Sequence, residues 1–384
     1  MMNGLTMSKT IDRVLVTGGL GFIGSHVVDL LVEKGYEVRV FDNLEPQVHG
    51  EAKKLPDYFN RRAELLVGDM RDKEAVVKAT SDVDAVIHLA AAVGVGQSMY
   101  QIEKYVACNT YGAANLLDVI VNKENSVKKL IVASSMSVYG EGKYKCASCG
   151  VVYPSLRKEE QLMNKDWEPK CPNCGASLKP LPTDEDKPLM PTSIYAQTKR
   201  HQEEMCLLVG RTYGLPTVAL RFFNVYGPRQ ALSNPYTGVC ALFSNRILNN
   251  KPPYIFEDGL QTRDFVHVKD VAKAVLLALE KSGGDYMPIN VGSGKPISII
   301  ELAEILIKLY GRNVKPYVSY KYRKGDIRHC YADISRARQL LGYEPTIRLE
   351  DGLKDLVKWA EERKWAAADL SDKAIRELEE RKLI

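Results

Sequence analysis

Residues 13–24 read RVLVTGGLGFIG, a short apolar run followed by a glycine-rich loop. Gly18, Gly21 and Gly24 stand at three-residue intervals before an amphipathic pattern that predicts a helix to about Lys34. In such a unit the first glycine makes the turn, the second lets a pyrophosphate approach the backbone, and the third lets helix and strand pack closely. The free N–H groups at the start of the helix would face the anion. The stretch therefore predicts a dinucleotide-binding site.

A second predicted strand covers 37–41 and ends at Asp42, eighteen residues after Gly24. A carboxylate at this position can accept hydrogen bonds from the hydroxyls of an adenosine ribose, and it would repel a 2′-phosphate. The sequence therefore predicts NAD, rather than NADP, as the cofactor of this site.

Strands and helices alternate through the first part of the chain. Further short apolar runs predict strands at 64–67, 85–89, 129–134 and 217–221. Helical patterns fall between them at 73–79, 99–122 and 194–212. Short apolar strands that alternate with helices indicate a parallel sheet covered on both faces. The expected fold class is α/β, with a Rossmann-type doubly wound parallel sheet.

After residue 222 the pattern changes, because Gly, Pro and Asn punctuate shorter elements, with helical patterns returning at 270–282 and 298–310. This change predicts a second, smaller mixed α/β domain that is interleaved with the first. The expected parts are a NAD-binding domain over 11–225 plus 264–282, a smaller domain over 226–263 plus 283–345, and a helical, highly charged tail over 346–384.

Composition excludes several classes of protein. The 384 residues are 45% hydrophobic and 26% charged, which is ordinary for a globular protein and rules out intrinsic disorder and small disulfide scaffolds. A net charge of +5 is too dilute to indicate a nucleic-acid partner, and no apolar stretch reaches the roughly 20 residues of a membrane span. The first residues, MMNGLTMSKT, have no apolar core of a secretory signal, so the cytoplasm is the expected location, with Met7 as a second candidate start.

Four of the eight cysteines form two Cys-x-x-Cys knuckles, Cys146 with Cys149 and Cys171 with Cys174. Two such knuckles can complete a tetrahedral four-sulfur site, which predicts zinc. Disulfides and an iron–sulfur cluster are the alternatives, the first disfavoured in a reducing cytosol. Four protein ligands leave no open position on the metal, so its role would be structural. The other cysteines, Cys108, Cys206, Cys240 and Cys330, show no metal spacing.

Tyr195 and Lys199 lie four residues apart in a predicted helix, so both side chains share one face. A phenol with a pKa of about 10 is a poor base at neutral pH, and a nearby cation favours the phenolate. Ser135, at the end of a predicted strand, could bond the substrate oxygen that Tyr195 deprotonates. Together these residues predict a proton-transfer site.

Several motifs now agree in order and spacing with one family. They are TGGLGFIGSH at 17–26, Asp42, LAA at 89–91, SSMSVYG at 134–140, YAQTK at 195–199 and RFFNVYGPR at 221–229. The chain resembles the extended short-chain dehydrogenase/reductases, the NAD-dependent nucleotide-sugar epimerases and dehydratases, over about 11–345. The resemblance implies a catalytic triad of Ser135, Tyr195 and Lys199, and it makes the smaller domain the one that binds the nucleotide sugar.

The resemblance also implies the binding residues and the assembly. Residues expected at the cofactor are Gly18, Gly21, Phe22, Ile23, Gly24, Asp42, Asn43, Asp69, Met70, Leu89, Ala90, Ala91, Asn109, Tyr195 and Lys199. Residues expected at the substrate are Ser135, Ser137, Asn224, Arg263, Arg323, Asp326 and Cys330. Guanidinium groups suit the diphosphate because they can bind it bidentately. A homodimer through the helices near 99–122 and 194–212 is also expected.

The residues after Ser135 select among the reactions of the family. The 4,6-dehydratases carry an Asp-Glu pair there, whereas this chain has Met136 and Ser137. One base and a hydride acceptor suffice for 4-epimerisation, which would pass through a transient 4-keto sugar with Tyr195 as the base. The alternatives are another NAD-dependent nucleotide-sugar enzyme (a dehydratase, a reductase or a C2 or C5 epimerase) and, more remotely, a non-catalytic NAD-sensing protein.

Two features bear on the substrate. By resemblance to the UDP-galactose 4-epimerases, Cys330 stands at a size gate, where a small residue leaves room for UDP-N-acetylhexosamines. Family members with similar zinc-knuckle insertions are often dTDP-L-rhamnose 4-epimerases, so UDP-glucose, UDP-N-acetylglucosamine and dTDP-L-rhamnose all stay open. The insertion itself, 144–182, is expected to form a small zinc ribbon. Its role could be a lid, a substrate wall, an oligomer contact or a self-stabilised loop, and its mixed charges do not suggest a nucleic-acid partner.

Overall fold

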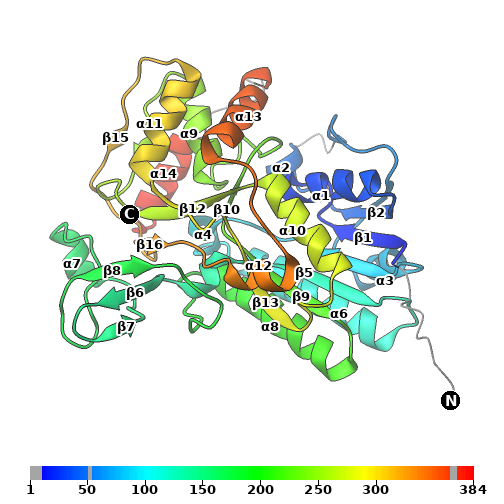
Figure 1. Ribbon diagram of the computed structural model, residues 1–384. Coiled ribbons are helices and arrows are strands. Elements are labelled where there is room, and N and C mark those ends of the chain that lie inside the picture. Colours follow the sequence, from blue (N-terminus) through cyan, green and yellow to red (C-terminus); the bar gives the residue numbers. More distant parts are fainter. Residues whose placement is uncertain (1–10, 51–53, 364–369) are drawn as a thin grey trace.

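The structure is a computed structural model that describes residues 11–50, 54–363 and 370–384. Both candidate start methionines therefore lie outside the described residues. The centre is a sheet of seven parallel strands in the order β13-β9-β5-β4-β1-β2-β3 (Figure 1). The strands are β1 (Arg13–Thr17), β2 (Glu37–Asp42), β3 (Glu64–Val67), β4 (Ala85–His88), β5 (Lys129–Ser135), β9 (Thr217–Phe222) and β13 (Met287–Val291). The Rossmann-type sheet predicted from the alternating pattern is confirmed.

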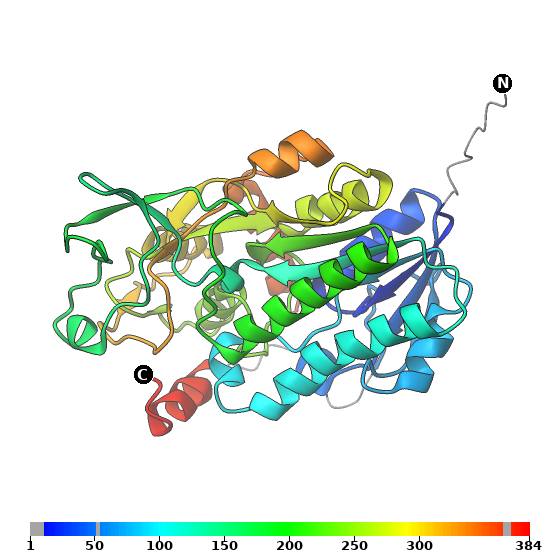
Figure 2. The same cartoon turned by 90° about the horizontal axis from the view of Figure 1, so that it is seen from below.

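Helices cover both faces of this sheet because its strands are apolar on both sides. In β1, Val14 and Val16 belong to the core under α1 (Phe22–Glu33) and α10 (Val268–Glu280), whereas Leu15 belongs to the opposite core. That opposite core lies under α3 (Lys73–Thr80), α6 (Gly112–Asn122) and α8 (Ile194–Tyr213). Figure 2 shows α6 (cyan) and α8 (green) side by side on this face.

The helix predicted over 99–122 is interrupted. It consists of α5 (Ile102–Tyr105), a π-helical turn (Val106–Tyr111) and α6. The π turn contains Asn109, whose side chain bonds the backbone of Ala92 on both its N–H and its C=O, at 2.7 and 3.0 Å. Three short elements precede or follow this region: α2 (Pro46–His49), α4 (Val95–Ser98) and a 3₁₀ turn (Met136–Tyr139).

Helix α8 is fixed to the sheet by a buried ion pair. Glu203 accepts hydrogen bonds from Arg221 on β9, at 2.5 and 3.0 Å, and from Ser134 on β5, at 2.6 Å. Both charged side chains are almost fully buried. Because the pair bridges β5 and β9, it sets the position of α8 over the carboxyl ends of these strands.

The smaller domain is built on a four-stranded sheet and a core of its own. The strands are β10 (Asn224–Tyr226), β12 (Thr262–His267), β14 (Pro296–Ser298) and β16 (His329–Cys330), and a separate pair joins β11 (Tyr254–Ile255) to β15 (Tyr317–Val318). The core packs between α9 (Val239–Leu248), α11 (Ile299–Tyr310) and α13 (Leu349–Glu362).

Three predicted ranges are wrong. The range 264–282 was expected in the NAD-binding domain, but its start lies in β12, a strand of the smaller domain's sheet. The range 283–345 was expected in the smaller domain, but β13 pairs with β9 in the large sheet, and α12 (Ser335–Leu341) packs its Ala337 and Leu341 into the large core. The range 346–384 was expected as a tail, yet α13 supplies Leu353 and Leu356 to the core of the smaller domain. The last described helix, α14 (Ser371–Glu380), is joined to α9 by the ion pair between Asp372 and Arg246. No described helix is long and apolar enough to cross a membrane.

The insertion forms a separate three-stranded sheet in the order β7-β6-β8, at the left of Figure 1. Its elements are β6 (Lys143–Cys146), β7 (Gly150–Val152), α7 (Glu159–Met163) and β8 (Leu178–Leu181). Its base joins the smaller domain, because Thr183 pairs with Ala332 and the N–H of Gly142 donates to the C=O of His329 at 2.9 Å. The insertion is thus docked on the strand β16 rather than free.

Candidate active site

One cavity of about 680 Å³ lies where the carboxyl ends of β1, β2 and β5 meet the smaller domain. Every predicted cofactor and substrate residue lines it except Asn109 and Cys330. Residues from the two ends of the chain therefore converge on one space. The position agrees with the general rule that open parallel sheets bind ligands beyond the carboxyl ends of their strands.

The glycine loop forms a cradle that a larger residue would fill. Gly18 has a φ of +69°, and a Cβ there would lie 2.9 Å from the backbone of Ala90. A Cβ on Gly24 would lie only 2.1 Å from the carbonyl oxygen of Gly18, so α1 could not start so close to β1. Gly21 is less crowded, with its ideal Cβ 3.3 Å from the same oxygen. Helix α1 therefore begins directly at the cavity wall with its first N–H groups facing inward.

The carboxylate of Asp42 lies at the end of β2, beside this cradle. It accepts hydrogen bonds from the N–H groups of Leu20 and Leu44, at 3.1 and 2.9 Å. Next to it, Asn43 donates to Asp69 at 3.0 Å, and Arg71 holds the pKa of the Asp69 carboxyl well below its usual range. A dinucleotide fits this donor set, since the loop presents amides to a pyrophosphate and Asp42 presents a carboxylate to ribose hydroxyls.

Ser135 at the end of β5 is oriented by its neighbour. Its Oγ accepts hydrogen bonds from the backbone N–H of Ser137, at 3.2 Å, and from the Ser137 hydroxyl, at 2.9 Å. Both acceptor positions of a hydroxyl are then used, so Ser135 has its own proton left to donate. Ser135 acts to lower the pKa of Tyr195, as expected when a serine hydroxyl donates toward a phenolate.

Of the two residues of α8 predicted to act in catalysis, Lys199 is buried and Tyr195 is half-buried where it lines the cavity. Burial is the larger influence on Tyr195 and raises its pKa above the ordinary value. Burial also lowers the pKa of Lys199 to about 8. The sequence argument expected a nearby cation to favour the phenolate of Tyr195; burial, which that argument left out, is the larger influence in the structure. The ammonium of Lys199 instead donates to Gln202 at 2.7 Å.

A chain of buried side chains continues from Lys199 to β1. Gln202 approaches Nε2 of His88 at 3.2 Å, and Nδ1 of His88 lies 2.8 Å from the hydroxyl of Thr17. Burial and the charge of Lys199 lower the pKa of His88 to about 3, so the ring is neutral near pH 7. Because the amide oxygen of Gln202 accepts from Lys199, its amide N–H must donate to Nε2, which assigns the ring proton to Nδ1.

Asn109 and Cys330 lie behind the cavity wall. Asn109 is fully buried, and its amide is used by Ala92 and by the Thr198 hydroxyl, at 3.0 Å. Asn109 was predicted at the cofactor, but its side chain lies behind the cavity wall. From there it holds the loop after β4 through Ala92. Cys330 is buried among Met136, Val138 and other apolar side chains and does not line the cavity. The size gate predicted at Cys330 is not supported, because its side chain does not reach the cavity.

The substrate end of the cavity carries unpaired acceptors and guanidinium groups. The Oδ1 of Asn224 and the Oε1 of Gln261 are buried with no partner among the described residues. A buried acceptor without a partner costs about 1–3 kcal/mol, so such atoms on a cavity wall suit the hydroxyl or N–H groups of a ligand. Arg263 and Arg323 line the same region.

Helix α14 is a part of the wall that the sequence analysis missed. Ala374, Ile375 and Leu378 line the cavity, and Asp372 forms ion pairs with Arg246 at 2.6 Å and Lys251 at 2.8 Å. These partners hold the pKa of Asp372 at about 2. The spacing of Ala374 and Leu378 was a usable signal for a packed helix face, but the high charge of the segment obscured it.

The four knuckle cysteines come together as predicted. The Sγ atoms of Cys146, Cys149, Cys171 and Cys174 lie within 4.8 Å of one another. The separation between Cys146 and Cys174 is 3.6 Å. Sulfurs about 2.3 Å from one tetrahedral ion would be about 3.8 Å apart, so the cluster has the size that a zinc ion needs.

Comparisons with known proteins agree with this site. The profile of the NAD dependent epimerase/dehydratase family matches residues 14–157 and 173–292. The chain is 37% identical over 349 residues to dTDP-L-rhamnose 4-epimerase of Burkholderia thailandensis, covering 90% of this chain and 94% of the relative. It is similar to the structure of UDP-N-acetylglucosamine 4-epimerase from Methanobrevibacter ruminantium M1 in complex with UDP-N-acetylmuramic acid (33% identity, TM-score 0.75, 92% and 99% of the two chains covered). It is also similar to UDP-glucuronic acid 4-epimerase from Bacillus cereus in complex with UDP-glucuronic acid and NAD (29% identity, TM-score 0.74, 91% and 99% covered).

The glycine cradle gives a first prediction. Gly21→Ala should leave the unfolding free energy of the cofactor-stripped protein nearly unchanged, because its Cβ needs only a small adjustment, yet weaken dinucleotide binding. Gly24→Ala should weaken dinucleotide binding as well, and it should also lower the unfolding free energy by about 1–3 kcal/mol, because α1 must shift away from β1. Denaturant unfolding and quantification of released NAD are the measurements. Equal NAD retention by Gly21→Ala and wild type would contradict the assignment of this loop to the pyrophosphate.

Proposed function

This chain belongs to the NAD-dependent epimerase/dehydratase family, and from that premise we propose that it is an NAD-dependent 4-epimerase of a UDP- or dTDP-linked sugar. The observation that carries the proposal is the meeting of Ser135, Tyr195 and the glycine loop in one cavity. The turn after Ser135 offers Met136 and Ser137 to that cavity and no carboxylate for elimination chemistry. The same family contains enzymes with other reactions, and this turn favours epimerisation over dehydration.

The cofactor residues named above would hold NAD along β1 and β2. When bound, NAD supplies a hydride acceptor and donor for C4 of the sugar. The chain itself then needs one group that takes the proton of O4 and returns it. Tyr195 is suited to this role because it lines the cavity on the same helix face as Lys199.

Ser135 and Lys199 both favour the phenolate form of Tyr195. Ser135 donates toward Tyr195 and so stabilises the phenolate form. Lys199, with a pKa of about 8, keeps most of its positive charge near pH 7. A buried cation on the same helix face also favours a developing phenolate. Both effects oppose the burial that raises the pKa of Tyr195.

The smaller domain would hold the nucleoside diphosphate. Arg263 and Arg323 lie on the cavity wall and can bind a diphosphate, while the free acceptor of Asn224 can take a sugar hydroxyl. Holding the diphosphate leaves the sugar free to turn about its tether, so that either face of C4 can meet the cofactor. The position of Cys330 no longer favours N-acetylated sugars, and both nucleotide classes remain candidates.

Proton NMR in deuterated water tests the function. UDP-glucose, UDP-N-acetylglucosamine and dTDP-L-rhamnose are incubated separately with the protein. We expect the C4 epimer of one of them, without deuterium on carbon, because the hydride removed from C4 returns to the same sugar. Deuterium at carbon or a stable 4-keto product would instead indicate deprotonation chemistry.

Tyr195→Phe is the matched variant for this experiment. It removes only the hydroxyl, so NAD should stay bound while turnover falls by roughly a hundredfold or more, the usual contribution of a general base. A variant that kept wild-type turnover would exclude Tyr195 as the base.

We further propose that Cys146, Cys149, Cys171 and Cys174 hold a structural zinc ion that folds the insertion. Metal coordination can fold so short a segment because its binding free energy becomes folding free energy. Thiolates that bind a zinc ion must stay reduced, and a reducing compartment keeps them so; the cytoplasm therefore remains the proposed location.

Elemental analysis of the purified protein should give one zinc per chain. Cys146→Ser should lose that zinc, because three thiolates and one hydroxyl bind it far more weakly. Cys108→Ser serves as the control and should keep it, since Cys108 lies outside the cluster. Iron in place of zinc, with visible absorption, would favour the iron–sulfur alternative.

We also propose a homodimer through the helices on the α6–α8 face. Apolar side chains are exposed there, among them Ile102, Tyr111 and Leu208, which are 50%, 54% and 63% exposed. Sedimentation equilibrium should give about twice the chain mass of 42.9 kDa, and Leu208→Glu should shift it toward the monomer. Leu260→Glu, at an exposed position elsewhere, should not. A monomeric wild type would contradict the proposal.

A further inference from the structure

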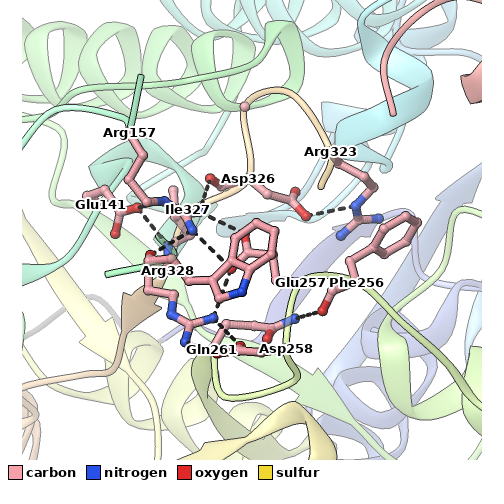
Figure 3. A network of polar contacts seen from close by, with 12 residues as sticks. Glu141, Arg157, Phe256, Glu257, Asp258, Gln261, Arg323, Asp326, Ile327 and Arg328 are labelled. Atoms are coloured by element: carbon pink, nitrogen blue, oxygen red, sulfur yellow. Dashed lines mark hydrogen bonds and ion pairs between the residues drawn. The ribbon is translucent and has the colours of Figure 1, made fainter. Parts of the chain in front are cut away.

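The insertion contacts residues of the cavity wall through buried ion pairs, on the side that faces away from the cavity. None of the described residues of the insertion lines the cavity, so it acts as neither its lid nor its wall. Instead, Arg157 of the insertion reaches two segments of the smaller domain that do line it, one around Glu257 and one around Asp326. Figure 3 shows these segments around Arg157, with the contacts drawn as dashed lines.

Arg157 makes a set of contacts that only a guanidinium can make. Its two terminal nitrogens each donate to one carboxylate oxygen of Glu257, both at 2.9 Å. One of them also donates to the C=O of Asp326 at 3.0 Å, and the other to the C=O of Trp167 at 2.9 Å. Its side chain is 1% exposed. A buried bidentate pair of this kind fixes orientation as well as charge.

Arg328 extends the network on the other side of Glu257. It donates to Glu257 at 2.9 Å and to both carboxylate oxygens of Asp258, at 2.7 and 2.9 Å. The insertion supplies another partner, since Glu168 accepts from Arg328 at 2.8 Å. Just before the insertion, Glu141 accepts from the backbone N–H of Arg328 at 2.7 Å. The two arginines thus share Glu257 between the insertion and the smaller domain.

The same two segments carry the groups that face a ligand. Arg263 donates to the C=O groups of Ile327 and Arg328, at 2.7 and 2.9 Å, so its guanidinium is placed by the backbone next to Asp326. Arg323 pairs with Asp326 at 2.7 Å and lies over the ring of Phe256, 4.7 Å from its centroid. Moving the segment around Asp326 would therefore move both cavity arginines.

We infer that Arg157 is a positioning residue for the nucleoside-diphosphate end of the cavity. It fastens the backbone at Asp326 to the carboxylate of Glu257, and this fixes the spacing between Arg263 and Arg323. The insertion thereby acts as a brace on the anion-binding wall. The inference rests on the proposed function, because it assigns a nucleoside diphosphate to this wall.

Calorimetric titration with UDP and with dTDP tests the brace, because it needs no turnover and no knowledge of the sugar. Arg157→Gln should bind whichever nucleotide the wild type binds roughly tenfold more weakly, the equivalent of about one charge-assisted hydrogen bond. Its NAD content should stay at the wild-type level, because none of the residues assigned to the dinucleotide contacts Arg157. In turnover, KM should rise by a similar factor while kcat stays within about twofold, since Tyr195 is not displaced.

Lys158→Gln is the matched control, because Lys158 is the next residue, carries the same charge and is exposed. It should bind nucleotide and NAD as the wild type does. Arg157→Lys keeps the charge but loses the bidentate geometry, so it should also bind nucleotide more weakly, and it serves where Arg157→Gln fails to fold.

The possible outcomes separate the brace from the function. Nucleotide binding by both Arg157 variants within about twofold of the wild type would overturn the brace. A parallel loss of NAD and nucleotide would also overturn it, because it would indicate a general structural defect. A wild type that binds neither UDP nor dTDP would instead overturn the proposed substrate class.

Discussion

The position of α8 over the sheet is the constraint on which the site depends, and two neighbouring residues set it. Gln202 reaches β4 and β1 through His88 and Thr17, while Glu203 reaches β9 and β5 through Arg221 and Ser134. Adjacent side chains on one helix thus contact four strands. Burying such polar groups is costly unless each has a hydrogen-bond partner, so these contacts favour a single position of α8 on the sheet. Tyr195 is placed relative to the glycine loop by these contacts rather than by the cavity itself.

Local sequence patterns were enough to predict the fold and the dinucleotide-binding end of the site. Val14, Leu15 and Val16 are apolar on successive positions, which a strand covered on both faces requires, and Gly24 must be a glycine because of its contact with Gly18. These properties belong to a few consecutive residues, so one sequence is enough to read them. The boundary at 282 failed because β13 (Met287–Val291) finds its partner in β9, far away in the chain.

The errors within the site have a related cause. Asn109 and Cys330 were assigned by their order in a motif, and motif order does not say whether a side chain faces a cavity or the layer behind it. Burial likewise raises the pKa of Tyr195. The exposed fraction of the Tyr195 side chain cannot be predicted from the spacing between Tyr195 and Lys199. The helix α14 was missed as cavity wall because its partners, such as Arg246, lie more than a hundred residues earlier.

The insertion supplies partners to buried charges of the smaller domain. The family profile matches up to Arg157 and resumes at 173, so Glu168 lies in the unmatched stretch. Removing the insertion would leave Glu257 with Arg328 alone, and Arg328 without Glu168. The Oε1 of Glu257 would lose its hydrogen bond to Arg157, and a buried acceptor without a partner costs about 1–3 kcal/mol. The charges of the smaller domain and those of the insertion therefore complete each other's hydrogen bonds. Without the insertion, Arg263 and Arg323 would be held less firmly in the cavity wall.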